Sequence, residues 1–313
     1  MPRKNTFTCV HAFLSIAWGH TLLFCAAILG MAIFPAFALA AETTSSFFIT
    51  SDGVRLHYLE TGKGTAIVFV PGWTMPAWIW SLQIQYFAKN FHVVALDPRA
   101  QGDSEKVNFG NYPERRARDV KELVDHLHLA PAVLVGWSLG VHELLSYAEQ
   151  FGGGTVKGYV LVDGPVWTKP DPQFIAAMLG MYRQLQTNRT DFTDKFVRSM
   201  FRQRQPEDYL RRLIAVSLQM PPDLAISDSV STISRADWSP AIRKLDRPVL
   251  VTCETSLKAL AADPITAVVP AARVELFEHA GHALFVDDAE HFNRTLRAFL
   301  DQTRAAATPA SRN

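Results

Sequence analysis

Short apolar runs alternate with amphipathic stretches along most of this chain. Residues 66–70 are continuously apolar and largely β-branched, which is the pattern of a strand buried on both faces. The runs that predict strands are 47–50, 54–60, 66–70, 91–96, 132–135, 158–162, 248–252 and 273–277. Helical spacing marks 78–89, 114–128, 138–151 and 289–302. This alternation predicts the α/β class, with a mostly parallel, doubly wound sheet and helices on both faces.

Residues 165–240 interrupt the alternation. Amphipathic helical stretches at 174–185, 193–202 and 209–218 fill this segment, and none of it has a strand pattern. An all-helical insertion in an α/β chain predicts a cap over the ligand-binding end of the sheet. We therefore expect a core formed by 41–164 and 241–313, with residues 165–240 as a helical cap.

The first forty residues have the pattern of an export signal. Arg3 and Lys4 precede an uncharged apolar stretch at 12–37, and small residues stand at Ala38 and Ala40. This pattern predicts a signal peptide over residues 1–40, cleaved after Ala40, and a periplasmic or secreted protein without a stable membrane partner. The alternative is an uncleaved anchor, because the stretch is long enough to cross a bilayer.

Charge and cysteine content narrow the function classes. The 313 residues include 31 basic and 30 acidic ones, and cleavage would leave 29 basic residues against 30 acidic. This balance argues against a nucleic-acid partner, which would select a basic excess. Cleavage would also remove Cys9 and Cys25 and leave Cys253 alone, so neither a disulfide framework nor a zinc site is expected. Nothing in the sequence calls for a metal or an organic cofactor.

A candidate nucleophile follows the strand at 132–135. Gly136-Trp137-Ser138-Leu139-Gly140 has the G-x-S-x-G pattern between a strand and a helix, the context in which a sharp turn exposes the serine hydroxyl. Glycine is needed on both sides because larger side chains would collide across the turn. The alternative is an ordinary strand-to-helix turn.

Four motifs in this order resemble the α/β-hydrolase superfamily, and the resemblance covers nearly all of residues 47–302. They are Val70-Pro71-Gly72-Trp73, Asp97-Pro98-Arg99-Ala100-Gln101-Gly102-Asp103-Ser104, Gly136–Gly140 and Ala280-Gly281-His282. The chain departs from the family pattern at Pro71, where a histidine is usual, and at Val141, where a second glycine is usual. In the family the turn at 97–104 is structural, and Arg99 is expected to pair with a carboxylate.

Histidine is the usual base for a serine nucleophile, because its pKa lies near neutrality. Of ten histidines, His282 is best placed, in a loop after the strand at 273–277. His279 is the nearest competitor, and His142 is expected to pack on the helix that follows Ser138. The oxyanion needs two backbone N–H donors. Leu139, after the nucleophile, is expected to supply one, and the resemblance implies Trp73 for the other.

The acid that orients the histidine has two candidates. Most of the superfamily has an aspartate soon after the seventh strand, but that stretch, 251–258, contains only Glu254 as a carboxylate. Asp163 ends the sixth strand, where haloalkane dehalogenases and some other branches place their acid. We favour Asp163 and keep Glu254 as the alternative.

A serine nucleophile predicts acyl transfer through an acyl-enzyme, and it excludes the aspartate mechanisms of dehalogenases and epoxide hydrolases. Aromatic and methionine residues near the expected pocket favour a small hydrophobic ester or lactone. The residues expected to line the pocket are Trp78, Trp137, Trp167 and Met178. Rival interpretations are an amidase, peptidase or C–C bond hydrolase, a haloperoxidase-like enzyme, and a binding protein with an incomplete triad.

Overall fold

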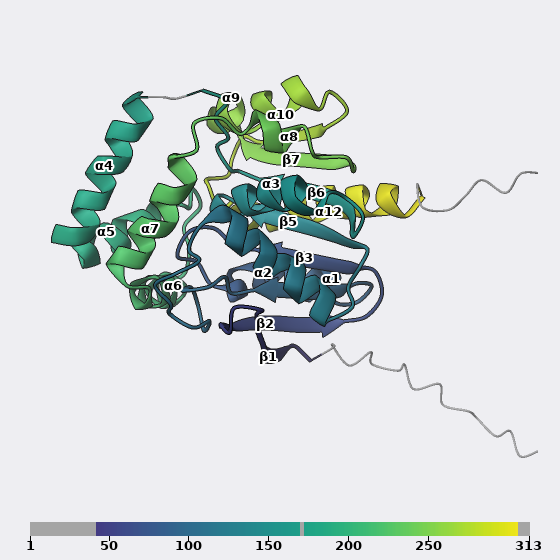
Figure 1. The fold of residues 1–313 in the computed structure, drawn as a ribbon, viewed down its shortest axis with the longest axis horizontal. Helices are drawn as coiled ribbons and strands as arrows, with labels where there is room; N and C mark the ends of the chain where they lie inside the picture. Colours follow the sequence, from purple (N-terminus) through teal and green to yellow (C-terminus); the bar gives the residue numbers. More distant parts are fainter. Residues whose placement is uncertain (1–41, 170–171, 306–313) are drawn as a thin grey trace, which may run out of the picture. The chain divides into compact units, whose positions relative to one another are not determined.

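The computed structural model describes residues 42–169 and 172–305 (Figure 1). The expected signal peptide, residues 1–40, lies outside the described residues, so its cleavage stays a prediction. Within the described ranges, none of the helices combines the length and the apolar character that a membrane crossing needs.

In the described residues, eight strands form one sheet in the order β1-β2-β4-β3-β5-β6-β7-β8. The strands are β1 (Thr44–Ile49), β2 (Arg55–Gly62), β3 (Ala66–Val70), β4 (His92–Leu96), β5 (Ala132–Trp137), β6 (Val156–Val162), β7 (Val249–Glu254) and β8 (Arg273–Phe277). β2 runs antiparallel to both β1 and β4, and all neighbouring pairs from β4 to β8 are parallel. The predicted α/β class with a mostly parallel sheet is confirmed.

Helices cover both faces of the sheet because side chains alternate along each strand. In β3, Ile67 and Phe69 enter one apolar cluster, while Val68 and Val70 enter another on the opposite face. The Ile67 face packs against η1 (Ala77–Trp80), α1 (Ser81–Phe87), α11 (Leu284–Asp287) and α12 (Ala289–Ala305). The Val68 face packs against α2 (Pro113–His126), α3 (Leu139–Phe151), α8 (Ser239–Ile242), η2 (Thr255–Leu257), α9 (Lys258–Ala261) and α10 (Asp263–Val268). This is the doubly wound arrangement.

Four helices between β6 and β7 lie together at one end of the sheet, at the left of Figure 1. They are α4 (Pro172–Thr187), α5 (Arg189–Ser199), α6 (Glu207–Gln219) and α7 (Pro222–Ile233). The sequence pattern did not predict α7, whose serine, threonine and aspartate residues favour other conformations. Leu224 and Ala225 of α7 are buried against Tyr182 and Leu185 of α4, so tertiary packing stabilises this helix. The cap boundaries at residues 165 and 240 stay a prediction.

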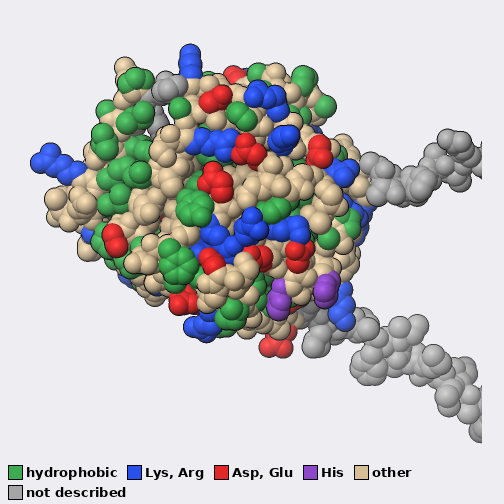
Figure 2. Space-filling model, in the orientation of Figure 1, with side chains coloured by type: hydrophobic (Ala, Val, Ile, Leu, Met, Phe, Trp, Pro, Cys, Tyr) green, Lys and Arg blue, Asp and Glu red, His purple; other side chains and the backbone are tan. Residues whose placement is uncertain are grey.

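Charges of both signs are mixed on the face that Figure 2 shows, where Lys and Arg side chains are interspersed with Asp and Glu. Ion pairs join Arg115 to Asp52 and Lys121 to Asp125. Hydrophobic side chains gather at the left, over α4, where Ile175 and Leu179 are exposed. Neither sign of charge therefore dominates this face.

Candidate active site

Ser138 occupies the sharp turn between β5 and α3. β5 ends at Trp137 and α3 begins at Leu139, so a single residue makes the change of direction. Ser138 has φ 55° and ψ −115°, a strained conformation for a residue with a side chain. A Cβ on Gly136 would lie 2.5 Å from the carbonyl oxygen of Gly140, so the turn has no room for one. The two glycines thus permit the strain that exposes the hydroxyl.

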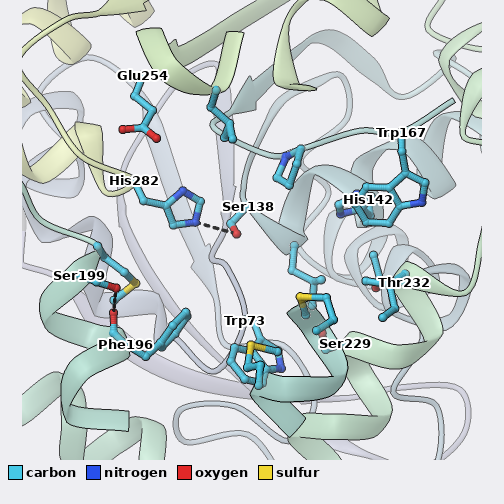
Figure 3. A pocket seen from close by; sticks show the side chains of 17 residues that line it. Trp73, Ser138, His142, Trp167, Phe196, Ser199, Ser229, Thr232, Glu254 and His282 are labelled. Atoms are coloured by element: carbon cyan, nitrogen blue, oxygen red, sulfur yellow. Dashed lines mark hydrogen bonds between the residues drawn. The ribbon is translucent and has the colours of Figure 1, made fainter. Parts of the chain in front are cut away.

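His282 lies between Ser138 and Asp163 and contacts both. Its Nε2 is 2.9 Å from Ser138 Oγ, and its Nδ1 is 2.7 Å from Asp163 Oδ2. Figure 3 marks the hydrogen bond between His282 and Ser138. With Nδ1–H donating to the carboxylate, Nε2 is free to accept the serine proton. The three residues come from loops at the carboxyl ends of β5, β6 and β8, which meet at one edge of the sheet. A carboxylate, an imidazole and a hydroxyl in contact in this order can make the hydroxyl nucleophilic.

Asp163 is fully buried, and hydrogen bonds satisfy both of its carboxylate oxygens. While Oδ2 faces His282, Oδ1 accepts the backbone N–H of Glu254 at 2.8 Å. A buried carboxylate needs such partners because it has lost its hydration. The carboxylate of Glu254 instead accepts the hydroxyl of Ser256 at 2.9 Å, and in the described part of the chain it makes no hydrogen bond to His282. The geometry thus brings Asp163 to the imidazole, and Glu254 contributes its backbone.

The loop that carries His282 is held from two sides. The indole N–H of Trp137 donates to the backbone carbonyl of His282 at 2.9 Å, and the ring centroids of these residues are 5.1 Å apart. The N–H of Gly281 donates to Asp287 Oδ2 at 2.8 Å. His279, the competing histidine, is exposed at the surface. Trp137 therefore links the nucleophile turn to the histidine loop, a contact that the sequence motif did not indicate.

A cavity of about 330 Å³ opens in front of Ser138 and His282. Its lining is mostly apolar and includes Trp73, Leu139, Trp167, Met178, Met181 and Phe196. The expectation that Trp167 and Met178 line the pocket agrees with this cavity. Phe196, on α5, was not among the expected lining residues, because the amphipathic pattern of α5 does not show which face meets the core.

Trp137 and Trp78 do not line the cavity, which corrects the expectation from the sequence. Trp137 is 1% exposed and packs against Phe285, because the residue before the nucleophile still belongs to the buried strand. Trp78 packs edge-on against Tyr209, and the Arg212 guanidinium lies 4.1 Å from its ring centroid. An aromatic residue near a motif can thus pack in the core, as Trp137 does, or against other side chains outside the cavity, as Trp78 does.

The backbone at Gly72 and Trp73 runs close to the nucleophile. A Cβ on Gly72 would lie only 3.0 Å from the Cβ of Ser138, so glycine permits the approach. The Trp73 indole donates to the carbonyl of Ala225 at 2.8 Å and ties this loop to α7. Leu139 is the first residue of α3, where backbone N–H groups have no partner within the helix. Trp73 therefore directly follows a residue that approaches Ser138, and Leu139 directly follows Ser138, while their role as oxyanion donors stays a prediction.

The motif at 97–104 forms a bonded turn. His57 Nδ1 is 2.7 Å from Asp97 Oδ2, and the N–H of Asp103 donates to the same carboxylate at 2.8 Å. These three residues are near enough to share a cation, but their hydrogen bonds account for the arrangement. Arg99 forms two 2.6 Å hydrogen bonds with Asp119, as expected for a structural pair.

Two other reactive side chains are buried in unreactive states. Burial lowers the pKa of His142 to about 4, and its ring packs between Trp167 and Trp238 at centroid distances of 5.2 and 4.8 Å. Burial raises the pKa of the Cys253 thiol to about 12, so the thiolate needed for reaction is disfavoured. Neither residue competes with the Ser138–His282 pair.

A model of the alpha/beta hydrolase family matches residues 67–294, so the chain belongs to this family of enzymes. A non-heme haloperoxidase of Rhodococcus erythropolis is 26% identical over 82% of this chain and 99% of its own length. A bifunctional esterase/perhydrolase of Acinetobacter calcoaceticus is 28% identical over 66% of this chain and 79% of its own. The solved esterase from Exiguobacterium antarcticum superposes with a TM-score of 0.75 at 20% identity, covering 82% of this chain and all of that one, and shows the shared fold.

Proposed function

We propose that this chain is a serine hydrolase that cleaves carboxylic esters or lactones through an acyl-enzyme. The main support is the continuous contact from Asp163 through His282 to Ser138, with heavy-atom distances of 2.7 and 2.9 Å. An apolar cavity in front of the serine suits the acyl or alkoxy part of a small hydrophobic ester. Similarity to a bifunctional esterase/perhydrolase agrees with this proposal.

In the proposed reaction, Ser138 Oγ attacks the ester carbonyl while His282 Nε2 removes the hydroxyl proton. Asp163 orients the imidazole and stabilises its cation. The N–H groups of Trp73 and Leu139 stabilise the oxyanion of the tetrahedral intermediate. When this intermediate collapses, His282 protonates the leaving alcohol. Water, activated by the same imidazole, then releases the acid and regenerates Ser138.

A haloperoxidase-like activity is the second candidate. The supporting observation is the similarity to the Rhodococcus erythropolis non-heme haloperoxidase over almost all of that protein. Bromination of a chromogenic acceptor with bromide, hydrogen peroxide and acetate tests it beside ester hydrolysis. The binding-protein interpretation depended on an incomplete triad, and the contacts of His282 argue against it.

We also propose that the enzyme is exported, with residues 1–40 removed. This proposal depends on the charged start, the apolar stretch and the small residues before Ala41. N-terminal sequencing of protein from the periplasm or the medium should begin at Ala41. A sequence that begins earlier contradicts cleavage at this site.

Labelling and kinetics together test the proposed reaction. A fluorophosphonate probe should label the protein at Ser138, and Ser138→Ala should not be labelled. Activity should be sought with p-nitrophenyl esters, lactones and amides. Asp163→Asn should lower kcat on the order of 10⁴-fold, because the imidazole loses its orienting carboxylate. A loss of that size in Glu254→Gln, with Asp163→Asn near wild type, would assign the acid role to Glu254.

A further inference from the structure

Glu254 has a carboxylate that the proposed reaction does not use. It ends β7 and lines the cavity beside His282, as Figure 3 shows. Apart from the two histidines, His142 and His282, it is the only lining residue with an ionisable side chain in the described part of the chain. The cavity therefore combines apolar walls with one acidic group on the side of His282.

Within the described ranges, no cation neutralises this carboxylate. Glu254 has no ion pair there, and its hydrogen bond with the Ser256 hydroxyl, at 2.9 Å, brings no charge. Lys258, four residues along the chain, pairs with Asp263. The other negative group of the site, Asp163, is fully buried and already bonded to His282. A substrate entering the cavity thus meets an uncompensated negative charge.

We propose that Glu254 selects substrates by charge, favouring esters with an ammonium or another cationic group and disfavouring esters with a second carboxylate. This inference rests on the proposed function, since it names the substrate class of the same site. A charge in a cavity with apolar walls acts more strongly than a charge in water. Rejection of a like charge is also an effective source of specificity.

The side chain and the backbone of Glu254 have separate roles, which makes the proposal testable. Its backbone N–H donates to Asp163, and a glutamine at this position keeps that bond. The glutamine carbonyl also remains an acceptor for Ser256. Glu254→Gln therefore removes the charge while it keeps the size, the main-chain contact and the side-chain contact.

The experiment compares three p-nitrophenyl esters of similar length: the butyrate, the hemisuccinate and the 4-(trimethylammonio)butyrate. Each kcat/KM is divided by the spontaneous hydrolysis rate of that ester, so that intrinsic reactivity cancels. We expect the ratio of the corrected kcat/KM values, cationic ester over anionic ester, to fall about tenfold in Glu254→Gln. Most of the change should be in KM, because the charge of Glu254 acts on the charge of the bound substrate. Glu290→Gln, whose side chain is 85% exposed on α12, is the matched control and should keep the wild-type ratio.

Each outcome decides the proposal. An unchanged ratio in Glu254→Gln overturns charge selection, while turnover of the butyrate still supports the proposed esterase. An equal loss of kcat/KM for all three esters also overturns charge selection, because the Glu254 side chain would then act through the triad or the fold. Failure of the wild type to turn over any of the three esters, together with absent fluorophosphonate labelling, overturns the proposed function and this inference with it.

Discussion

Replacing Glu143 with glutamine should stabilise the protein above pH 8 and leave its stability nearly unchanged at pH 5. Glu143 lies in a buried cluster where α2, α3 and α7 meet. The Nη1 atom of Arg116 is 3.1 Å from Glu143 Oε1 and 2.9 Å from Asp228 Oδ2. All three side chains are 1% exposed. One guanidinium therefore faces two carboxylates that have both lost their hydration.

The direction follows from the pKa of the Glu143 carboxyl, which burial raises from 4.5 to about 8 although Arg116 opposes the rise. The folded state then holds its proton to higher pH than the unfolded chain. Stability that is fully present below pH 4.5 is thus lost as the pH rises to about 8. The whole shift corresponds to at most about 5 kcal/mol. We expect Glu143→Gln to recover about 2 kcal/mol, because the glutamine gives up part of the attraction to Arg116.

Urea unfolding followed by tryptophan fluorescence at pH 5, 7 and 9 measures this effect. The unfolding free energy of Glu143→Gln should depend less on pH than that of the wild type and exceed it at pH 9. Glu290→Gln, at an exposed position, should follow the wild type at every pH. Equal destabilisation of Glu143→Gln at pH 5 and pH 9 would refute the reasoning, since the ionised pair with Arg116 would then stabilise the fold.

Two further pairs of variants test how the site is held. Trp137→Phe removes the N–H that holds the His282 carbonyl and should lower kcat about tenfold with little change in KM. Steady-state kinetics should show no such fall in kcat for Trp80→Phe, since among the described residues the Trp80 indole N–H has no hydrogen-bond partner. Thermal unfolding should show that Gly136→Ala lowers the free energy of unfolding by about 3 kcal/mol, because the new Cβ collides with the backbone of Gly140. Gly180→Ala, where a Cβ on α4 would meet open space, should raise the free energy of unfolding by about 0.5–1 kcal/mol, because alanine favours a helix. The same change in stability for both variants would contradict the steric argument.

The sequence predicts the sheet well because each central parallel strand is buried on both faces and must be continuously apolar. In β3, all five residues are buried, and the expected strand at 66–70 has the observed bounds. The helices α4 to α7 are harder to predict from the sequence, because they bury only part of their surface. α7 depends on the packing of Leu224 and Ala225 against α4, a contact that the hydrophobic pattern of α7 alone does not predict.

The sequence favours Asp163 as the acid but leaves Glu254 open, because both residues lie at the same edge of the sheet. Val162 of β6 pairs with Thr252 of β7, so the two candidate acids emerge from neighbouring strands. Their backbones then diverge: Asp163 adopts φ 48°, whereas Glu254 stays extended at φ −65° and ψ 151°. Aspartate tolerates the left-handed conformation better than most residues, and that turn accompanies the approach of its carboxylate to His282. The sequence therefore indicates which residues lie at the carboxyl-terminal edge of the sheet. The backbone φ that turns the Asp163 side chain toward His282 depends on the surrounding fold.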